Sequence, residues 1–340
     1  MLLILLLISI LSISYGPVEI SLIQMKDIFL NQIGFKENST SFSKIHQTVL
    51  LNIRLPRIIL AILVGAGLGT SGAILQGLFR NPLVDPGFIG VSSGAAIGAM
   101  ITIMFGKFIY SFIPSFLENF TLPLLAMTGA FLTTLLVYKM SKVGNKTNIM
   151  AMLLSGIAIN ALCGSIIGLF VSMSSDEELR SFTFWTLGGL DMADWNVSFI
   201  TSLFIITPFI FIYKIQYQMD IFMLGDAESE HLGVNSELLK KKIILISSIM
   251  VGVGVSFCGM IGFIGLVTPH LIRLFIGPNH RYLIPGSALM GAILLILSDL
   301  ISKSVIAPAQ LPIGVVTSAL GAPFFLWLIY SQKRRFSYGE

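Results

Sequence analysis

The stretch Met219–Lys242 reads MDIFMLGDAESEHLGVNSELLKKK and separates two long apolar parts of the chain. It is too polar to cross a bilayer, because a central Asp or Lys costs ~2.5–3.5 kcal/mol on insertion scales. Apolar residues nevertheless recur within it, and Gly225 and Gly233 stand where short helices would stop. We therefore predict two short amphipathic helices joined at Gly233 that lie against one membrane face, with an ordinary polar loop as the alternative.

The composition is that of an integral membrane protein. The 340 residues are 55% hydrophobic and only 11% charged, with a mean hydropathy of +0.89, whereas a soluble domain carries roughly 25% charged residues. At roughly 20 residues per span, the apolar runs allow about ten helices, so we expect one all-α polytopic domain over residues 1–340. The net charge of +4 is spread among loops and does not indicate nucleic-acid binding. Cys163 and Cys258 lie in apolar runs and are expected to be buried thiols.

The apolar runs define the expected spans. Met1–Ser14 is short and lacks the basic residues that begin a signal peptide, so we expect a first helix, with a cleaved signal as the alternative. The other runs are Arg57–Leu78, Phe88–Phe105, Thr121–Lys139, Ile149–Val171, Val197–Tyr213, Ile243–Phe257, Gly262–Ile276, Leu283–Ile301 and Pro312–Tyr330. Because Ile243–Ile276 is too long for one crossing, a turn is expected near Gly259. A small helix is expected at Met25–Gln32.

Loop charges and a weak repeat predict the topology. An even number of spans places both termini on one side, and the loops of that side carry the excess of Lys and Arg, including Lys240–Lys242. Both termini and the 219–242 stretch are therefore expected to be cytoplasmic. Arg57–Leu60 resembles Lys242–Leu245, so spans 2–5 and 7–10 would form the inverted repeat typical of transporters. Chance similarity between two Gly-rich helices is the alternative.

Acidic pairs raise one catalytic alternative. Asp191-Met192-Ala193-Asp194 has the DxxD spacing with which some membrane prenyltransferases hold Mg²⁺-diphosphate, and Asp176–Glu178 is the candidate for the second acidic group that this chemistry needs. Four-residue acidic matches are common by chance. No GxxxxGK[ST] motif occurs, so the chain is not expected to hydrolyse nucleotide. Asp299 and Lys303 are spaced to pair along a helix. No metal site or cofactor is expected.

A set of short motifs extends over most of the chain. It comprises Arg54-Leu55-Pro56-Arg57, Gly65–Gln76, Asn81-Pro82-Leu83, Asp85-Pro86-Gly87, Leu224-Gly225-Asp226, Leu232-Gly233-Val234, Gly262–His270, Leu311–Val315 and Gly321-Ala322-Pro323. Together these motifs resemble the permeases of binding-protein-dependent ABC importers for iron chelates, haem and cobalamin. The resemblance runs from about Ile20 to Leu328. It implies a homodimer of ten-span subunits in the cytoplasmic (inner) membrane, with a pathway along the dimer axis; a heterodimer with a related permease is the alternative.

The resemblance also implies protein partners. Two cytoplasmic ABC ATPases would dock on the loop between spans six and seven. The coupling residues implied there are Leu224, Gly225, Asp226, Glu228, His231, Leu232, Gly233 and Val234. A periplasmic or lipid-anchored binding protein would deliver the chelate, and the basic residues that meet its acidic side chains map onto Arg54, Arg57 and Lys303.

The resemblance further implies a cytoplasmic gate and a class of substrate. The gate of the family maps onto Asn81 and Leu83 in one loop and onto Thr147 and Asn148 in another, where the 145–150 loop departs from the family pattern. No residue in the spans identifies the ligand. An iron(III)-siderophore is the substrate most common in such a family, with haem or cobalamin as alternatives.

Overall fold

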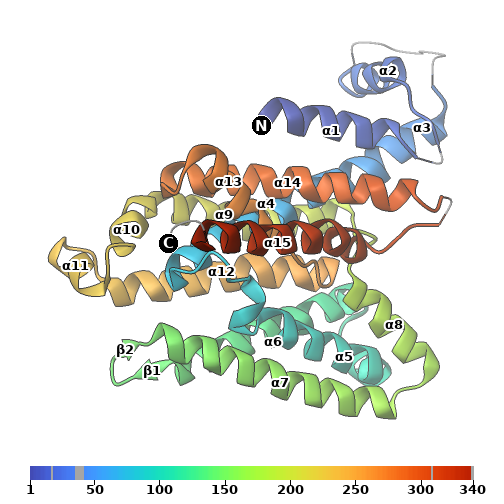
Figure 1. Ribbon diagram of the computed structural model, residues 1–340. Coiled ribbons are helices and arrows are strands. Elements are labelled where there is room, and N and C mark those ends of the chain that lie inside the picture. The colour runs from blue at the N-terminus through green and yellow to red at the C-terminus, as the bar shows by residue number, and fades with distance from the viewer. Residues whose placement is uncertain (17, 35–41, 308, 338–340) are drawn as a thin grey trace.

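The computed structural model describes residues 1–16, 18–34, 42–307 and 309–337, which form an all-α membrane protein (Figure 1). Seven helices are long and apolar enough to cross a membrane, and three shorter apolar helices bring the total over the described residues to ten. The predicted all-α polytopic fold with about ten spans is confirmed. Helices prevail because, in lipid, a helix satisfies its backbone donors and acceptors within itself.

The long spans are α4 (Leu55–Phe79), α5 (Val91–Tyr110), α6 (Glu118–Met140), α7 (Ile149–Met173), α9 (Trp195–Lys214), α12 (Ser236–Cys258) and α14 (His280–Ser304). The shorter apolar helices are α1 (Leu2–Ser14), α13 (Ile264–Ile276) and the first part of α15 (Ile313–Ser337). Each expected span coincides with one of these helices. The turn between α12 and α13 begins at Gly259, as predicted, with a φ of 67°.

Short elements connect the spans. They are α2 (Leu22–Gln32), α3 (Lys44–Thr48), the π-helical η1 (Val49–Arg54), the 3-10 helices η2 (Pro86–Ile89) and η3 (Ser115–Leu117), strands β1 (Lys142–Val143) and β2 (Lys146–Thr147), α8 (Asp176–Leu187), α10 (Gln216–Phe222) and α11 (Asp226–His231). The small helix predicted near residue 25 is α2. No helix is predicted for α8, which begins with a capping box formed by Ser175 and Glu178.

Helix α4 forms the centre of the bundle. It packs on α14 and α13, while α12 packs on α6 and α5, so the first helix of each predicted repeat packs on helices of the other. The inverted repeat itself stays a prediction. Glycines allow the close approach, since a Cβ on Gly65 would lie 2.4 Å from the carbonyl oxygen of Gly291 and a Cβ on Gly72 would lie 1.8 Å from that of Gly265. In contrast, only 11% of the α7 span is buried, against 83% of the span that contains α4.

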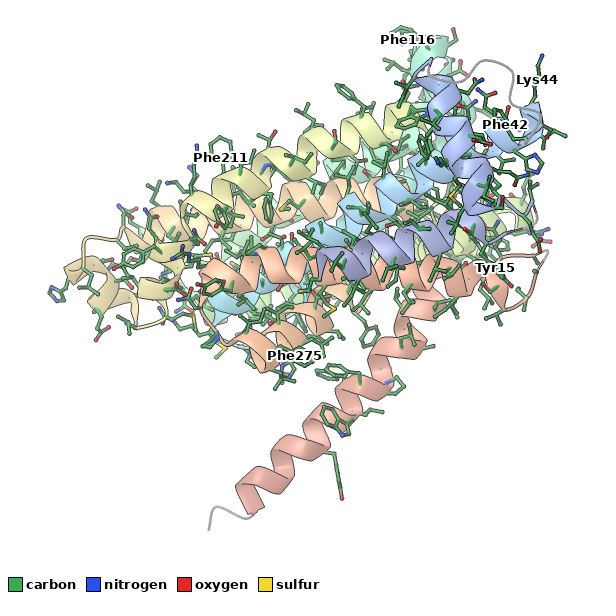
Figure 2. All side chains as sticks on the ribbon, turned by 90° about the horizontal axis from the view of Figure 1, so that it is seen from above. Tyr15, Phe42, Lys44, Phe116, Phe211 and Phe275 are labelled. Atoms are coloured by element: carbon green, nitrogen blue, oxygen red, sulfur yellow. The ribbon has the colours of Figure 1, made fainter. Side chains whose placement is uncertain are left out.

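The connecting elements gather at two opposite ends of the bundle. Helices α10 and α11 lie at one end with the β1–β2 hairpin, and α8 lies at the other end with the last turns of α1 and α14 (Figure 1). We call these the α11 end and the α8 end. Helix α15 diverges from the other helices (Figure 2), and Leu326 and Trp327 on it are exposed.

Candidate functional site

The 219–242 stretch forms the tip of the α11 end. Gly225 and Gly233, with φ of 129° and 83°, bound α11 on its two sides and end short helices there, as predicted. The second predicted short helix is wrong. From Ser236 onward the chain is already the first turn of span α12, since Asn235 caps that helix and no proline interrupts it before Cys258.

The implied coupling residues divide into an exposed and a buried group. Leu224 and Leu232 are 63% and 58% exposed on the two sides of α11, and Glu228 and His231 are exposed between them. Val234 is buried and supports the turn that leads into α12. The α11 end therefore presents apolar side chains next to acidic ones. These side chains lie outside every span, so they are in contact with water unless a partner protein covers them.

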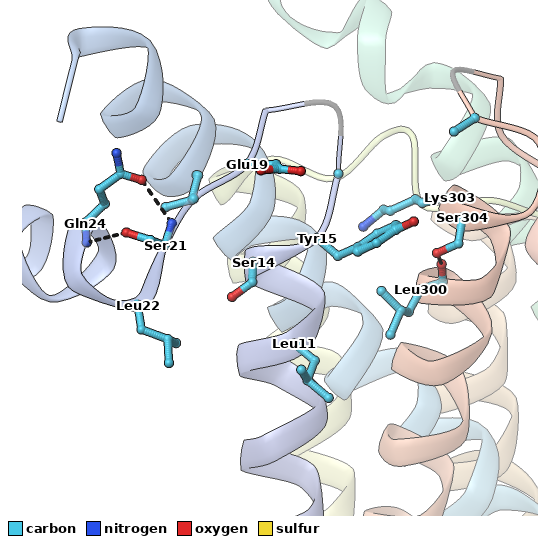
Figure 3. A pocket seen from close by; sticks show the side chains of 13 residues that line it. Leu11, Ser14, Tyr15, Glu19, Ser21, Leu22, Gln24, Leu300, Lys303 and Ser304 are labelled. Carbon is cyan, nitrogen blue, oxygen red and sulfur yellow. Dashed lines mark hydrogen bonds between the residues drawn. The ribbon is translucent and has the colours of Figure 1, made fainter.

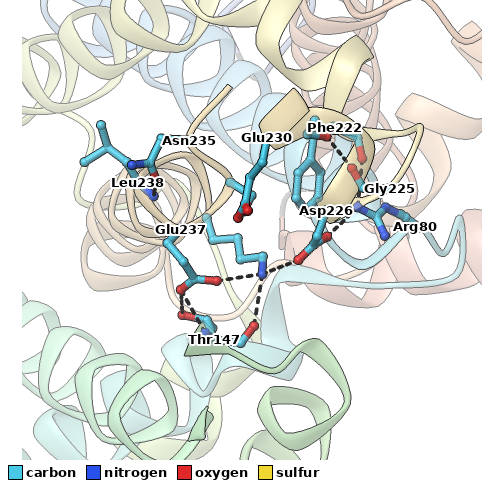
Figure 4. Close-up of polar contacts among 12 residues, drawn as sticks. Arg80, Thr147, Phe222, Gly225, Asp226, Glu230, Asn235, Glu237 and Leu238 are labelled. Carbon is cyan, nitrogen blue, oxygen red and sulfur yellow. Dashed lines mark hydrogen bonds and ion pairs between the residues drawn. The ribbon is translucent and has the colours of Figure 1, made fainter. Parts of the chain in front are cut away.

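A buried ammonium connects this surface to the hairpin (Figure 4). Lys240 Nζ lies 2.6 Å from Asp226 Oδ2, 2.8 Å from Glu237 Oε1 and 3.1 Å from the carbonyl oxygen of Thr147. The other carboxylate oxygen of Asp226 accepts a hydrogen bond of 2.7 Å from Arg80. Burial opposes ionisation of Asp226, but the hydrogen bonds from Lys240 and Arg80 outweigh it and hold the pKa of this carboxyl below its ordinary value.

The implied gate residues have different surroundings. Thr147 is 4% exposed and belongs to the Lys240 network. Asn148 is exposed and caps α7 by accepting a hydrogen bond of 2.9 Å from the Ala151 amide. Asn81 accepts a hydrogen bond of 2.9 Å from the amide of Leu83, which is 37% exposed. The network thus includes Thr147 directly, and the gate role of all four residues stays a prediction.

At the α8 end, two of the implied docking cations share one carboxylate. Arg57 Nε lies 2.9 Å from Asp299 Oδ1, and Lys303 pairs with the other oxygen of Asp299, so the predicted pairing of Asp299 with Lys303 is confirmed. Asp191, which is 81% exposed, lies 3.3 Å from Arg57 Nη1. Lys303 also lines a cavity of about 1210 Å³ between α1 and α14, together with Tyr15 (Figure 3).

Arg54 is engaged with the backbone instead. Its guanidinium donates hydrogen bonds to the carbonyl oxygens of Ile13, Ser14 and Val18, and the residue is 6% exposed. It therefore fastens the end of α1 to the start of α4. All three implied docking cations have partners within the chain, and their docking role stays a prediction.

The acidic pair of the enzyme alternative has structural partners as well. Asp194 caps α9 by accepting a hydrogen bond of 2.6 Å from the Val197 amide, and Glu178 belongs to the capping box of α8. Within the described residues, no three His, Cys, Asp or Glu side chains are grouped so that they could hold a metal ion. Cys163 and Cys258 are free and buried, as predicted.

Three members of the Lys240 network are absent from the residues that sequence reasoning singled out for function. They are Arg80, Glu237 and Lys240. The only local signal is the spacing of Glu237 and Lys240, which are three positions apart on one helix. Lys240 cannot be told from Lys241 and Lys242 in the sequence, although only Lys240 is buried.

Comparison with known proteins identifies the family. The sequence model of the FecCD transport family matches residues 3–331. The chain belongs to the FecCD transport family. Among FecCD-type relatives, the hemin transport system permease protein HmuU of Yersinia pestis is 43% identical over 289 residues, which are 84% of each chain. The vitamin B12 import system permease protein BtuC of Salmonella typhi is 38% identical over 282 residues, 83% of each chain.

A solved structure resembles this FecCD-family chain along almost its whole length. It is described as an inward-facing conformation of a metal-chelate type ABC transporter, with a TM-score of 0.83 and 29% identity over 97% of each chain. The chain is therefore a multi-pass membrane permease of the ABC importer class, as its motifs implied. Permeases of this class work with ATPase and substrate-binding partners.

Proposed function

We propose that this importer permease carries an iron-containing chelate into the cell, with a ferric siderophore as the first candidate and haem as the second. The coupling of this transport to an ATPase is supported by the α11 end, where exposed Leu224 and Leu232 flank an acidic helix that a partner can cover. The chain has no phosphate-binding loop, so we assign ATP hydrolysis to a partner. Haem is the second candidate because a hemin permease is 43% identical to this chain.

The partner at the α11 end would be the ATPase dimer. Leu224 and Leu232 would enter an apolar groove of the ATPase, while Glu228 and His231 would fix the orientation at its rim. This assignment makes the α11 end cytoplasmic. Because α1 begins and α15 ends toward the same end of the bundle, both termini would also be cytoplasmic (Figure 1).

A second copy of the permease and a binding protein would complete the importer. The exposed span α7 and the divergent α15 leave apolar surface for lipid and for a second copy, which supports a homodimer with the pathway between the subunits. The binding protein would meet the α8 end at Arg54, Arg57 and Lys303, the cations that the resemblance implies for docking.

Uptake by the purified importer tests the proposal. The permease, its ATPase and its binding protein would be reconstituted in liposomes and offered a ⁵⁵Fe-siderophore, haem or cyanocobalamin. We expect ATP-dependent uptake of one of the two iron compounds, and none when the ATPase carries a hydrolysis-deficient mutation. Uptake of cobalamin alone would contradict the substrate class. Uptake that persists with the inactive ATPase would contradict the coupling of transport to ATP hydrolysis.

A further inference from the structure

The hairpin residue Thr147 is held by all of its polar groups. Its backbone amide and its hydroxyl both donate to Glu237 Oε2 at 2.8 Å, and its carbonyl oxygen accepts from Lys240 at 3.1 Å. Glu237 and Lys240 are three positions apart on the first turns of α12. Span α12 therefore fixes the position of the hairpin through hydrogen bonds to a single residue.

Lys240 has no spare hydrogen-bonding capacity. An ammonium group has three N–H donors, and the three acceptors of Lys240 are Asp226, Glu237 and the Thr147 carbonyl oxygen. The side chain is 3% exposed. A buried charge persists only when it is paired and hydrogen-bonded, so removal of any one acceptor disturbs the whole arrangement. The neighbouring Lys241 is exposed and forms no ion pair with any of the described residues.

Asp226 connects the same network to the other gate loop. Its Oδ1 accepts a hydrogen bond from Arg80, which ends α4 and directly precedes Asn81. Arg80 adopts a φ of 47°, a left-handed conformation that is uncommon for a residue with a side chain. Its guanidinium also donates to the Phe222 carbonyl oxygen at 2.8 Å and lies over the Phe222 ring. Helix α10 and Asp226 together hold this turn in place.

We propose that Asp226 and Lys240 are positioning residues that join both halves of the predicted gate to helix α11. Asp226 is the first residue of α11, and its two oxygens bind Arg80 of the Asn81 turn and Lys240 of the Thr147 hairpin. The network contains two cations, Arg80 and Lys240, and two anions, Asp226 and Glu237, so it has no net charge. A displacement of α11 by a bound ATPase then moves both gate loops together. The inference rests on the proposed function of α11 as the ATPase-binding helix.

The importer with nitroxide labels at Asn145, in the hairpin, and Ala227, on α11 outside the implied coupling residues, tests the inference. Both residues are exposed. In the otherwise unchanged importer we expect one narrow distance that stays the same with and without ATP. In Lys240→Met, which keeps the aliphatic stem, the distance should broaden and change with ATP. Uptake per ATP hydrolysed should fall at least about fivefold, the lower range of coupling between sites. Lys241→Met is the matched control and should change neither quantity.

A double-mutant cycle separates positioning from general damage. Asp226→Asn should give the same defect, and the double variant with Lys240→Met should be no worse than either single variant, because both act through one link. If Lys240→Met does not assemble, Asp226→Asn alone carries the distance measurement. An unchanged narrow distance with normal uptake per ATP in these variants would overturn the inference. The distance between the labels can be measured without substrate, so this result does not depend on the proposed iron-chelate function. Failure of that function would appear instead as absent uptake in the unmutated importer.

Discussion

At each end of the bundle one carboxylate is shared by two basic side chains, but the exposure of this shared carboxylate differs. At the α11 end the Lys240 side chain is 3% exposed, while its partners Asp226 and Glu237 are 41% and 27% exposed. At the α8 end the shared carboxylate of Asp299 is only 1% exposed. Water and a partner protein can reach the first pair of acids and cannot reach Asp299. The α11 network can therefore rearrange, whereas the Asp299 network must stay intact.

The two networks also differ in what they connect. The α11 network joins a short helix, a hairpin and the end of a span, which can move without breaking the bundle. The Asp299 network joins the spans α4 and α14, whose glycines already touch. Both networks pair two cations with two acids, so net charge does not separate them. We therefore expect mutations at the α8 end to act on assembly and mutations at the α11 end to act on coupling.

Asp299→Asn gives the sharpest test of this difference. The change leaves Arg57 and Lys303 facing one another without their shared anion. Loss of one member of a buried ion pair costs roughly 3–5 kcal/mol. We expect a large loss of thermal stability in detergent, measured as the temperature at which the monodisperse peak disappears in size-exclusion chromatography.

Asp191→Asn is the matched control, because it removes the other carboxylate that contacts Arg57. The Asp191 side chain is 81% exposed, and exposed ion pairs contribute roughly 0–1 kcal/mol. Its melting temperature should stay close to that of the unmodified permease. Equal losses for the two variants would show that exposure does not distinguish these carboxylates, and the comparison of the two ends would fail.

The pH dependence of the α11 network follows from the lowered pKa of Asp226. A carboxyl with a lowered folded-state pKa stabilises the folded state above its unfolded value of about 3.9, and this contribution is lost as the pH falls through the lower folded value. The distribution of distances between labels at Asn145 and Ala227 should therefore stay narrow from neutral pH down to about 4 and broaden only below it. Broadening near pH 6 would show that another group controls the network.

The spans could be predicted because a membrane helix depends on local apolar length alone. The pairing of Asp299 with Lys303 could be predicted for the same reason, since the two lie on one helix four residues apart. Arg57 and Asp299 are 242 residues apart, and Lys240 and Thr147 are 93 apart, so no local pattern brings them together. Only the packed arrangement of spans distinguishes Lys240 from its two lysine neighbours.

Two local features differ from the prediction although the sequence contains the signal for them. The capping box of α8 is present in the sequence as Ser175 and Glu178, and Glu178 lies in the acidic segment 176–178 that the enzyme alternative needs. The helix after Gly233 begins at Ser236, and the charges of Lys240–Lys242 suggested that it would stop before the apolar run. It continues because a buried, fully paired Lys240 removes the cost of a charge at this position.

The smallest expected effect concerns docking at the α8 end, and an increase in charge tests it better than a loss. Asp191→Asn raises the net charge of the cluster by one without touching Asp299. If an acidic binding protein meets this cluster, its association should become about twofold faster and more dependent on salt, because surface charges act mainly on the encounter rate. Stopped-flow or biolayer measurement at two ionic strengths would detect this change.

Asp176→Asn is the control for this measurement, since it makes the same change of charge on the exposed first turn of α8, outside the cluster. A faster association in Asp191→Asn alone supports docking on Arg57 and Lys303. Equal acceleration in both variants means that the binding protein responds only to the overall charge of the surface. No acceleration in either variant means that these buried cations serve the fold, because Asp299 and the α1 carbonyl oxygens already occupy their hydrogen-bonding groups.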